Sequence, residues 1–159
     1  MMKAKKQEEL IVKGIKLFTS IFMKYDIMEK KPIDIGNGVK LHSSLIHTIE
    51  AIGKGYGKTV TELSIHFMIT KGAVSQVIAI LEKDGYILKT KGNNKKIILE
   101  LSEKGRSVFE CHEKYNESAM KELISMKGKY TEMELQSFLN ILNDIDLFFG
   151  KFITVEMKI

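Results

Sequence analysis

The sequence has one cysteine, one proline and no tryptophan among its 159 residues. The lone Cys111 excludes an internal disulfide and leaves no Cys-x-x-Cys pair for metal or redox chemistry. Apolar runs such as Val77–Leu81 fall far short of the roughly 18 residues that a membrane helix needs. The first residues are charged and do not form the apolar core of a signal peptide. We therefore expect a cytoplasmic protein with no membrane partner, stabilised by packing.

Charge is unevenly distributed along the chain. Apolar residues make up 44% and charged residues 28%, which is ordinary globular usage and favours one domain over 1–159. Residues 1–31 hold eight Lys against four acidic residues, whereas residues 107–159 hold six Lys against nine. Within eight residues, Lys89, Lys91, Lys95 and Lys96 occur with no acid between them. Such a cluster attracts phosphate, although most lysine runs are only solvated surface.

Apolar residues recur at helical spacing in six segments, which predicts a mainly α-helical fold. The first helix should end near Lys31, before Pro32, and Thr61 is the expected N-cap of a short third helix. Segments 86–90 and 96–101 are rich in β-branched and apolar residues and flank Gly92-Asn93-Asn94, so they predict a β-hairpin. The remaining helices are expected to begin at Ser43 or Ser44, Thr70, Ser102 and Thr131.

Residues 43–101 therefore follow the order helix, short helix, helix, two-stranded hairpin, which is typical of a winged helix-turn-helix. In that arrangement the helix from Lys71 presents its first polar side chains to base edges in the major groove, and the basic hairpin tip reaches the flanking backbone or minor groove. The expected DNA-binding residues are Ser43, Thr61, Thr70, Lys71, Gly72, Ser75, Gln76, Lys89, Lys91, Asn93, Asn94, Lys95 and Lys96.

The chain resembles the MarR-type transcriptional regulators. The resemblance covers nearly the whole chain, and it is carried by four segments: Thr61-Glu62-Leu63, Thr70-Lys71-Gly72-Ala73-Val74-Ser75-Gln76, Leu81-Glu82-Lys83-Asp84-Gly85-Tyr86 and Leu101-Ser102-Glu103-Lys104-Gly105-Arg106. It implies an α+β fold with a winged lobe at 43–101 and helical dimerisation regions at 1–31 and 107–159. It also implies a homodimer that binds a pseudo-palindromic operator as a repressor and is released by an effector. The large apolar stripes of the terminal helices agree, because a lobe of roughly 60 residues can hardly bury them.

Two departures from the family pattern bear on DNA reading. The wing carries Lys where relatives usually have Asp and Arg, and lysine cannot mimic the planar fork of arginine. We therefore expect phosphate or shallow minor-groove contacts from Lys95 and Lys96. Gln76 replaces a residue that is often basic in relatives, and Gln pairs best with adenine, which favours an A/T-rich operator. Arg106 matches a residue with a structural role at the wing base of relatives.

The effector is not specified by the sequence. No cofactor is required for the predicted activity, and an organic effector would find an amphipathic pocket at Tyr25, His47, Tyr56 and Tyr115. His47 and His112 resemble two ligand positions of zinc-responsive members, with His42, Asp26, Glu29 or Cys111 as candidate further ligands. Packing histidines are the ordinary alternative. Oxidant sensing by Cys111 is disfavoured, because this residue lies on an apolar stripe and buried cysteines are usually inert.

No enzyme is indicated. Ser43, Ser44 and His47 form no Gly-x-Ser-x-Gly elbow, and Gly57-Lys58-Thr59 does not have the earlier glycine of a phosphate-binding loop. Two non-enzymatic alternatives remain open: a winged-helix adaptor between proteins, and a protein that binds DNA without sequence preference. An adaptor would tolerate acids on the exposed face of the helix from Lys71, and this helix has none before Glu82.

Overall fold

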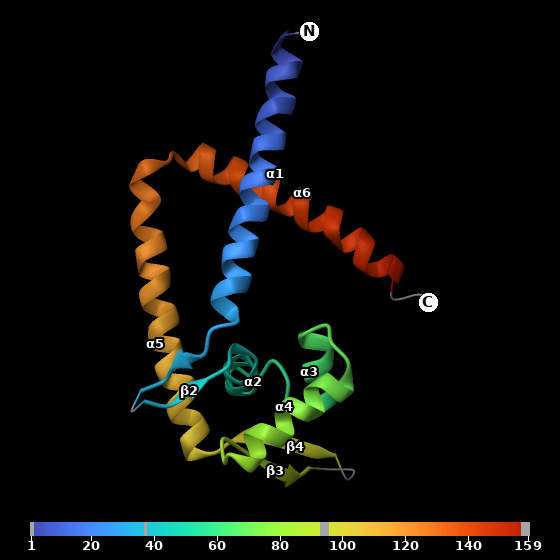
Figure 1. Ribbon diagram of the computed structural model, residues 1–159, viewed down its shortest axis with the longest axis vertical. Coiled ribbons are helices and arrows are strands. Elements are labelled where there is room, and N and C mark those ends of the chain that lie inside the picture. Colours follow the sequence, from blue (N-terminus) through green and yellow to red (C-terminus); the bar gives the residue numbers. More distant parts are fainter. Residues whose placement is uncertain (1, 37, 93–95, 157–159) are drawn as a thin grey trace. The chain divides into compact units, whose positions relative to one another are not determined.

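The computed structural model describes residues 2–36, 38–92 and 96–156, with side chains for 5–36, 38–92 and 96–151. The elements follow one another as α1 (Met2–Glu29), β1 (Ile33–Asp34), β2 (Lys40–Leu41), α2 (Ser43–Gly53), α3 (Val60–His66), α4 (Lys71–Lys83), β3 (Ile87–Lys91), β4 (Ile97–Leu101), α5 (Glu103–Ser125), a short 3₁₀ helix (Met126–Lys129) and α6 (Glu132–Glu156) (Figure 1). The chain divides into two compact units, Met1–Lys114 and Tyr115–Ile159.

The expected helix, short helix, helix and hairpin are all present. Strands β3 and β4 form the hairpin, which is called the wing below. They pair antiparallel, with Ile87 opposite Leu101 and Lys89 opposite Leu99. Helices α2, α3 and α4 pack with this hairpin around a core that includes Ile46, Leu63 and Ile78. The predicted α+β class with a small wing is therefore confirmed. A second, two-stranded sheet of β1 and β2 was not predicted, and each of its strands has only two residues.

Helix starts follow the expected capping chemistry with two exceptions. The Thr70 hydroxyl accepts a hydrogen bond from the Ala73 amide at 3.2 Å, and Ser102 and Thr131 cap their helices in the same way. The third helix, however, is capped by Thr59 rather than Thr61, because the Thr59 hydroxyl accepts from the Glu62 amide and the Glu62 carboxylate accepts from the Lys58 amide.

The second exception is helix α2. His42 is its N-cap and makes no capping hydrogen bond through its side chain, so neither Ser43 nor Ser44 is the N-cap. Ser43 lies inside the first turn, and its hydroxyl donates a hydrogen bond to the carbonyl of Glu29.

The base of the wing is fixed to the start of α5 by several polar contacts. The Ser102 amide donates to the Tyr86 carbonyl at 3.0 Å, and the Ser102 hydroxyl donates to the Gly85 carbonyl at 2.7 Å. The Lys104 ammonium lies 4.1 Å from the centre of the Tyr86 ring. Gly105 passes directly beside the Tyr86 carbonyl. Helix α4, the wing and α5 are consequently joined at one point.

The turn between α3 and α4 contains a backbone conformation that the sequence did not predict. Met68 has φ 54°, in the left-handed region that favours glycine, and its side chain is 74% exposed. Met68→Gly should therefore raise the free energy of unfolding by about 0.5–1 kcal/mol, or roughly 1–4 °C in Tm, because the strain disappears and little packing is lost. Thermal unfolding by circular dichroism measures this. Met68→Ala is the matched control, since it shortens the side chain but keeps the strain, and an equal gain in both variants would contradict the prediction.

Among the described residues no single helix is long and apolar enough to span a bilayer, and only the bent pair of α3 and α4 meets the criterion together.

Candidate nucleic-acid interface

Helix α4 has one apolar face and one polar face. Val74, Ile78 and Leu81 are buried against the core of the lobe. The opposite side carries small and polar residues that can approach another surface closely. All of the residues predicted there are exposed: Thr70, Lys71, Gly72, Ser75 and Gln76.

A groove with a volume of about 660 Å³ runs between α3, α4 and the wing. Thr61, although not the N-cap, lies in this groove and is exposed. Ser75 enters it from α4, and Lys89 and Lys96 enter it from β3 and the start of β4. The structure therefore brings together one predicted residue from α3, one from α4 and two from the wing.

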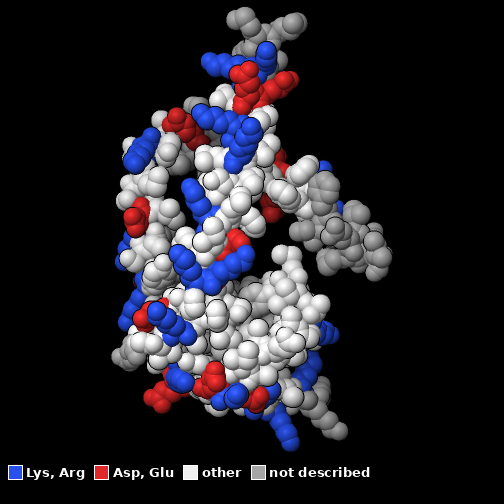
Figure 2. Space-filling view, in the orientation of Figure 1, with Lys and Arg blue, Asp and Glu red and all other residues white. Residues whose placement is uncertain are grey.

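The lysines of the wing differ in their surroundings. Lys91 and Lys96 are exposed, whereas the Lys89 ammonium is 2.5 Å from a carboxylate oxygen of Glu82 on α4. Figure 2 shows basic side chains along the edge of the lobe where β3 and β4 lie, with acidic side chains between them. The predicted contacts Asn93, Asn94 and Lys95 lie outside the described residues.

Ser43 does not belong to this surface, and its assignment to DNA binding was wrong. Its side chain is only 4% exposed, and its hydroxyl donates a hydrogen bond of 2.6 Å to the carbonyl of Glu29 at the end of α1. The first position of an amphipathic helix looks accessible in sequence, but here the end of α1 covers it.

A polar cluster joins α2 and α5 and contains both predicted histidines. One donor atom each from His47, Glu50 and His112 lies within 4.8 Å of the other two, which is a spacing that a single metal ion could bridge. The Glu50 carboxylate oxygen Oε2 is 3.5 Å from His47 Nδ1 and 3.4 Å from His112 Nε2. Glu50 was not predicted, although its i,i+3 spacing from His47 places both on one face of α2.

Charged neighbours hold this cluster in place. Lys54 contacts the other oxygen of Glu50 at 2.6 Å and Glu113 at 3.0 Å, and His47 Nε2 lies 2.8 Å from Glu29 Oε2. The His112 side chain is 5% exposed, and this burial lowers the pKa of its imidazole despite the nearby Glu50 carboxylate.

The pKa values of Glu50 and Lys54, which contact each other, are shifted in opposite directions. Burial has the largest single influence on Glu50 and raises its pKa, but Lys54 and the two imidazoles together outweigh burial and lower that pKa below its usual range. The hydrogen bonds that the Lys54 ammonium donates to Glu50 and Glu113 raise the pKa of Lys54. Glu50 is therefore held ionised beside the histidines.

The predicted ligand-pocket residues Tyr25, Tyr56 and Tyr115 differ in their surroundings. Partial burial and the Glu29 carboxylate raise the pKa of Tyr25, which places Tyr25 beside the same carboxylate that His47 contacts. Tyr56 instead stacks on the His66 ring, with ring centres 5.2 Å apart. Tyr115 is an exposed residue of α5. The organic pocket stays a prediction.

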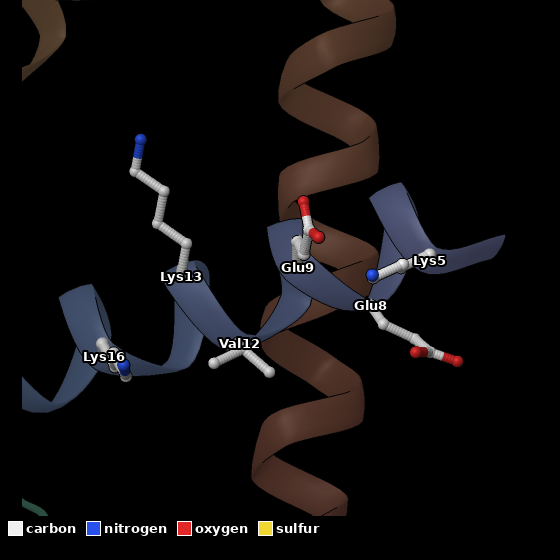
Figure 3. Close-up of a pocket in the computed structure, with 6 residues that line it drawn as sticks. All are labelled: Lys5, Glu8, Glu9, Val12, Lys13 and Lys16. Atoms are coloured by element: carbon white, nitrogen blue, oxygen red, sulfur yellow. The ribbon is translucent and has the colours of Figure 1, made fainter. Parts of the chain in front are cut away.

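A second concavity lies on α1 alone. Figure 3 shows its six lining residues, whose charged groups point in different directions and do not converge on one point. This concavity is therefore a shallow depression on the surface of one helix, without the convergent polar groups of a binding site. The lining residues are Lys5, Glu8, Glu9, Val12, Lys13 and Lys16.

Large apolar side chains are exposed on each terminal helix. In α1, Ile11 and Phe22 are 63% and 64% exposed, and in α6 Phe138 and Phe149 are more than half exposed. The side chain of Phe152, also in α6, lies outside the described residues. Cys111, expected to be buried, is exposed, because α5 turns Val108 and His112 toward the core instead.

These features have counterparts among known proteins. No family model matches the chain. The sequence is similar to an uncharacterized HTH-type transcriptional regulator, YhjH of Bacillus subtilis (strain 168), with 25% identity over 122 residues, which cover 76% of this chain and 70% of that protein.

Solved structures define the fold. The zinc-responsive MarR family member ZitR of Lactococcus lactis has a TM-score of 0.71 at 18% identity, over 87% of this chain and 99% of ZitR. The chain has the fold of the MarR family. Streptococcus pneumoniae FabT in complex with DNA matches this MarR fold with a TM-score of 0.72 at 23% identity, over 88% of this chain and 97% of FabT. YhjH is named a transcriptional regulator and ZitR a MarR family member, and neither name denotes an enzyme.

Proposed function

We propose that this chain is a MarR-family transcriptional regulator that binds double-stranded DNA sequence-specifically, as a homodimer, in the cytoplasm. The observation that carries the proposal is the exposed polar face of α4 beside a groove that Lys96 enters from the wing. Such a helix fits the major groove, and lysines beside it suit the flanking phosphates. FabT, whose structure has the same fold, was crystallised with DNA.

The exposed apolar faces of α1 and α6 support a homodimer. Contiguous apolar surface on a terminal helix is unfavourable in water and is typical of an interface. Two copies related by a twofold axis would present two α4 helices to half-sites about one helical turn apart, so the operator should be a pseudo-palindrome. Repression follows if the operator overlaps a promoter, and an effector that changes the spacing of the two lobes would release DNA.

The first experiment selects operator sequences from a random DNA library with the full chain. Fluorescence anisotropy then compares the selected duplex with a shuffled duplex across a salt series. A preference of roughly 1,000-fold or more for the selected duplex is expected of a specific regulator. Equal binding to both duplexes would favour a protein that coats DNA, and failure to bind either would favour an adaptor between proteins.

A divalent metal ion, with zinc as the probe, is the effector that a specific observation favours. Two imidazoles and a carboxylate that is held ionised are suitable ligands for zinc, and His47, Glu50 and His112 provide them within 4.8 Å. ZitR, which has the same fold, is described as zinc-responsive. A bound ion would link α2 to α5 through these residues and so alter the position of the lobe that carries α4.

Zinc should raise the Tm of the wild-type chain. At a concentration 100-fold above Kd the stabilisation would be about 2.7 kcal/mol, and His112→Gln should abolish most of it because one of three ligands is lost. Differential scanning calorimetry with and without zinc measures the effect. His66→Gln is the matched control, since His66 is an exposed residue of α3 outside the cluster, and zinc should stabilise this variant as it does the wild type. If zinc leaves the wild-type Tm unchanged, or shifts it equally in His112→Gln, the cluster is a packing network.

A further inference from the structure

Lys89 lies on the side of the wing that faces α4. In the β3–β4 register, Ile87 is opposite Leu101 and Lys89 is opposite Leu99. Side chains two positions apart share one face of a strand, so Lys89 lies on the same face as the buried Ile87. Its side chain also lines the groove between α3, α4 and the wing. Lys89 is thus directed toward α4 and not toward the outer face of the hairpin.

The ion pair of Lys89 connects two elements of the proposed interface. Glu82 is in the last turn of α4, and its carboxylate accepts a hydrogen bond of 2.5 Å from the Lys89 ammonium. The side chains are only 43% and 34% exposed, so each is partly shielded from water. Lys91 and Lys96 differ, since no ion pair of either is found among the described residues. Within the described wing, Lys89 is therefore the lysine whose charge is already compensated.

We propose that the Glu82–Lys89 pair fixes the wing against α4 and sets DNA specificity, with Lys89 a positioning residue and not a phosphate contact. This inference rests on the proposed function. If Lys89 turned to a phosphate, the Glu82 carboxylate would be left unpaired beside the negatively charged duplex, which is unfavourable. A compensated lysine also releases no counterion from DNA. A fixed distance between α4 and the wing favours the one register in which both fit the operator, and this preorganisation discriminates against other sequences.

The test uses two variants that leave the net charge of the chain unchanged. Glu82→Gln with Lys89→Gln removes the pair, and Glu82→Lys with Lys89→Glu reverses it. Lys96→Gln is the reference for loss of a phosphate contact. Each protein is titrated against the selected and shuffled duplexes across the salt series, and circular dichroism checks that each variant is folded.

The neutral double variant should lose up to about fivefold in the ratio of specific to nonspecific affinity, the scale of one surface ion pair, with an unchanged salt slope. The reversed pair should restore the ratio to within about twofold of wild type. Lys96→Gln should lower the slope of log K against log salt by about 0.9.

Two results would overturn the inference. In the first, the neutral double variant shows the same fall in slope as Lys96→Gln, which would make Lys89 a phosphate contact. In the second, the ratio is unchanged, or the reversed pair does not restore it. Failure of the wild-type chain itself to prefer the selected duplex would instead remove the proposed function, so the two failures are distinguishable.

Discussion

Gly105→Ala should lower the free energy of unfolding by about 3 kcal/mol or more, because steric overlap with the backbone cannot be relieved locally. A Cβ atom at this position would lie 2.0 Å from the carbonyl oxygen of Tyr86 and 3.5 Å from a methyl carbon of Leu101. The Tyr86 oxygen cannot simply move away, since it accepts the hydrogen bond from the Ser102 amide. The start of α5 must then shift away from the wing. Urea unfolding followed by circular dichroism measures the loss, and the Tm should fall by roughly 6–12 °C.

Gly72→Ala is the matched control for this prediction. Gly72 is a helical glycine of the same lobe, and a Cβ there would meet only the Thr70 hydroxyl oxygen at 3.8 Å, an ordinary contact. Alanine at this position should leave the stability unchanged or raise it by up to about 1 kcal/mol, because alanine is the better helix former. A loss of less than 1 kcal/mol in Gly105→Ala would mean that α5 and the wing base are not held in this close contact.

The helices and the wing could be predicted from sequence because their signals are local. Three helices are capped by the hydroxyls of Thr70, Ser102 and Thr131, each of which accepts a hydrogen bond from the backbone amide three residues later. This pattern involves only residues close in sequence, so it can be recognised there. Gly85, with φ 75°, directly follows the C-cap of α4, and a glycine in the left-handed region is a common local signal for a helix end. The polar face of α4 is likewise fixed by helical periodicity once its apolar face is known.

The remaining features depend on contacts between elements. Glu82 and Lys89 are seven residues apart on a helix and a strand, so no single periodicity places them together. The burial of Ser43 requires the end of α1 to pass over α2, and the exposure of Cys111 depends on which side of α5 meets the core. Thr61 was mistaken for a cap because Thr59, two positions earlier, has the same chemistry and the better partner in Glu62. Tertiary packing decided the first three cases, and a local choice between two threonines decided the last.

Gln76→Ala should weaken binding to the selected operator by roughly 10-fold or more and leave binding to shuffled DNA unchanged. Gln76 is exposed in the second turn of α4, one residue after the groove-lining Ser75. A Gln amide that contacts an adenine edge with two hydrogen bonds contributes about 1–3 kcal/mol of discrimination, and this contribution vanishes in alanine. Because the side chain is uncharged, the salt slope should not change. Fluorescence anisotropy on the selected and shuffled duplexes measures both quantities.

The same variant should also change what DNA the chain selects. If Gln76 contacts one adenine in each half-site, a selection repeated with Gln76→Ala should lose the preference at one symmetry-related pair of positions and keep the others. Gln136→Ala, the same substitution on an exposed residue of α6, is the control and should alter neither affinity nor selected sequence. Equal losses on operator and shuffled DNA would point to a change in folding, which the Tm reports. An unchanged operator affinity and an unchanged selection would show that Gln76 does not contact a base, and the face of α4 that reads DNA would then have to be reassigned.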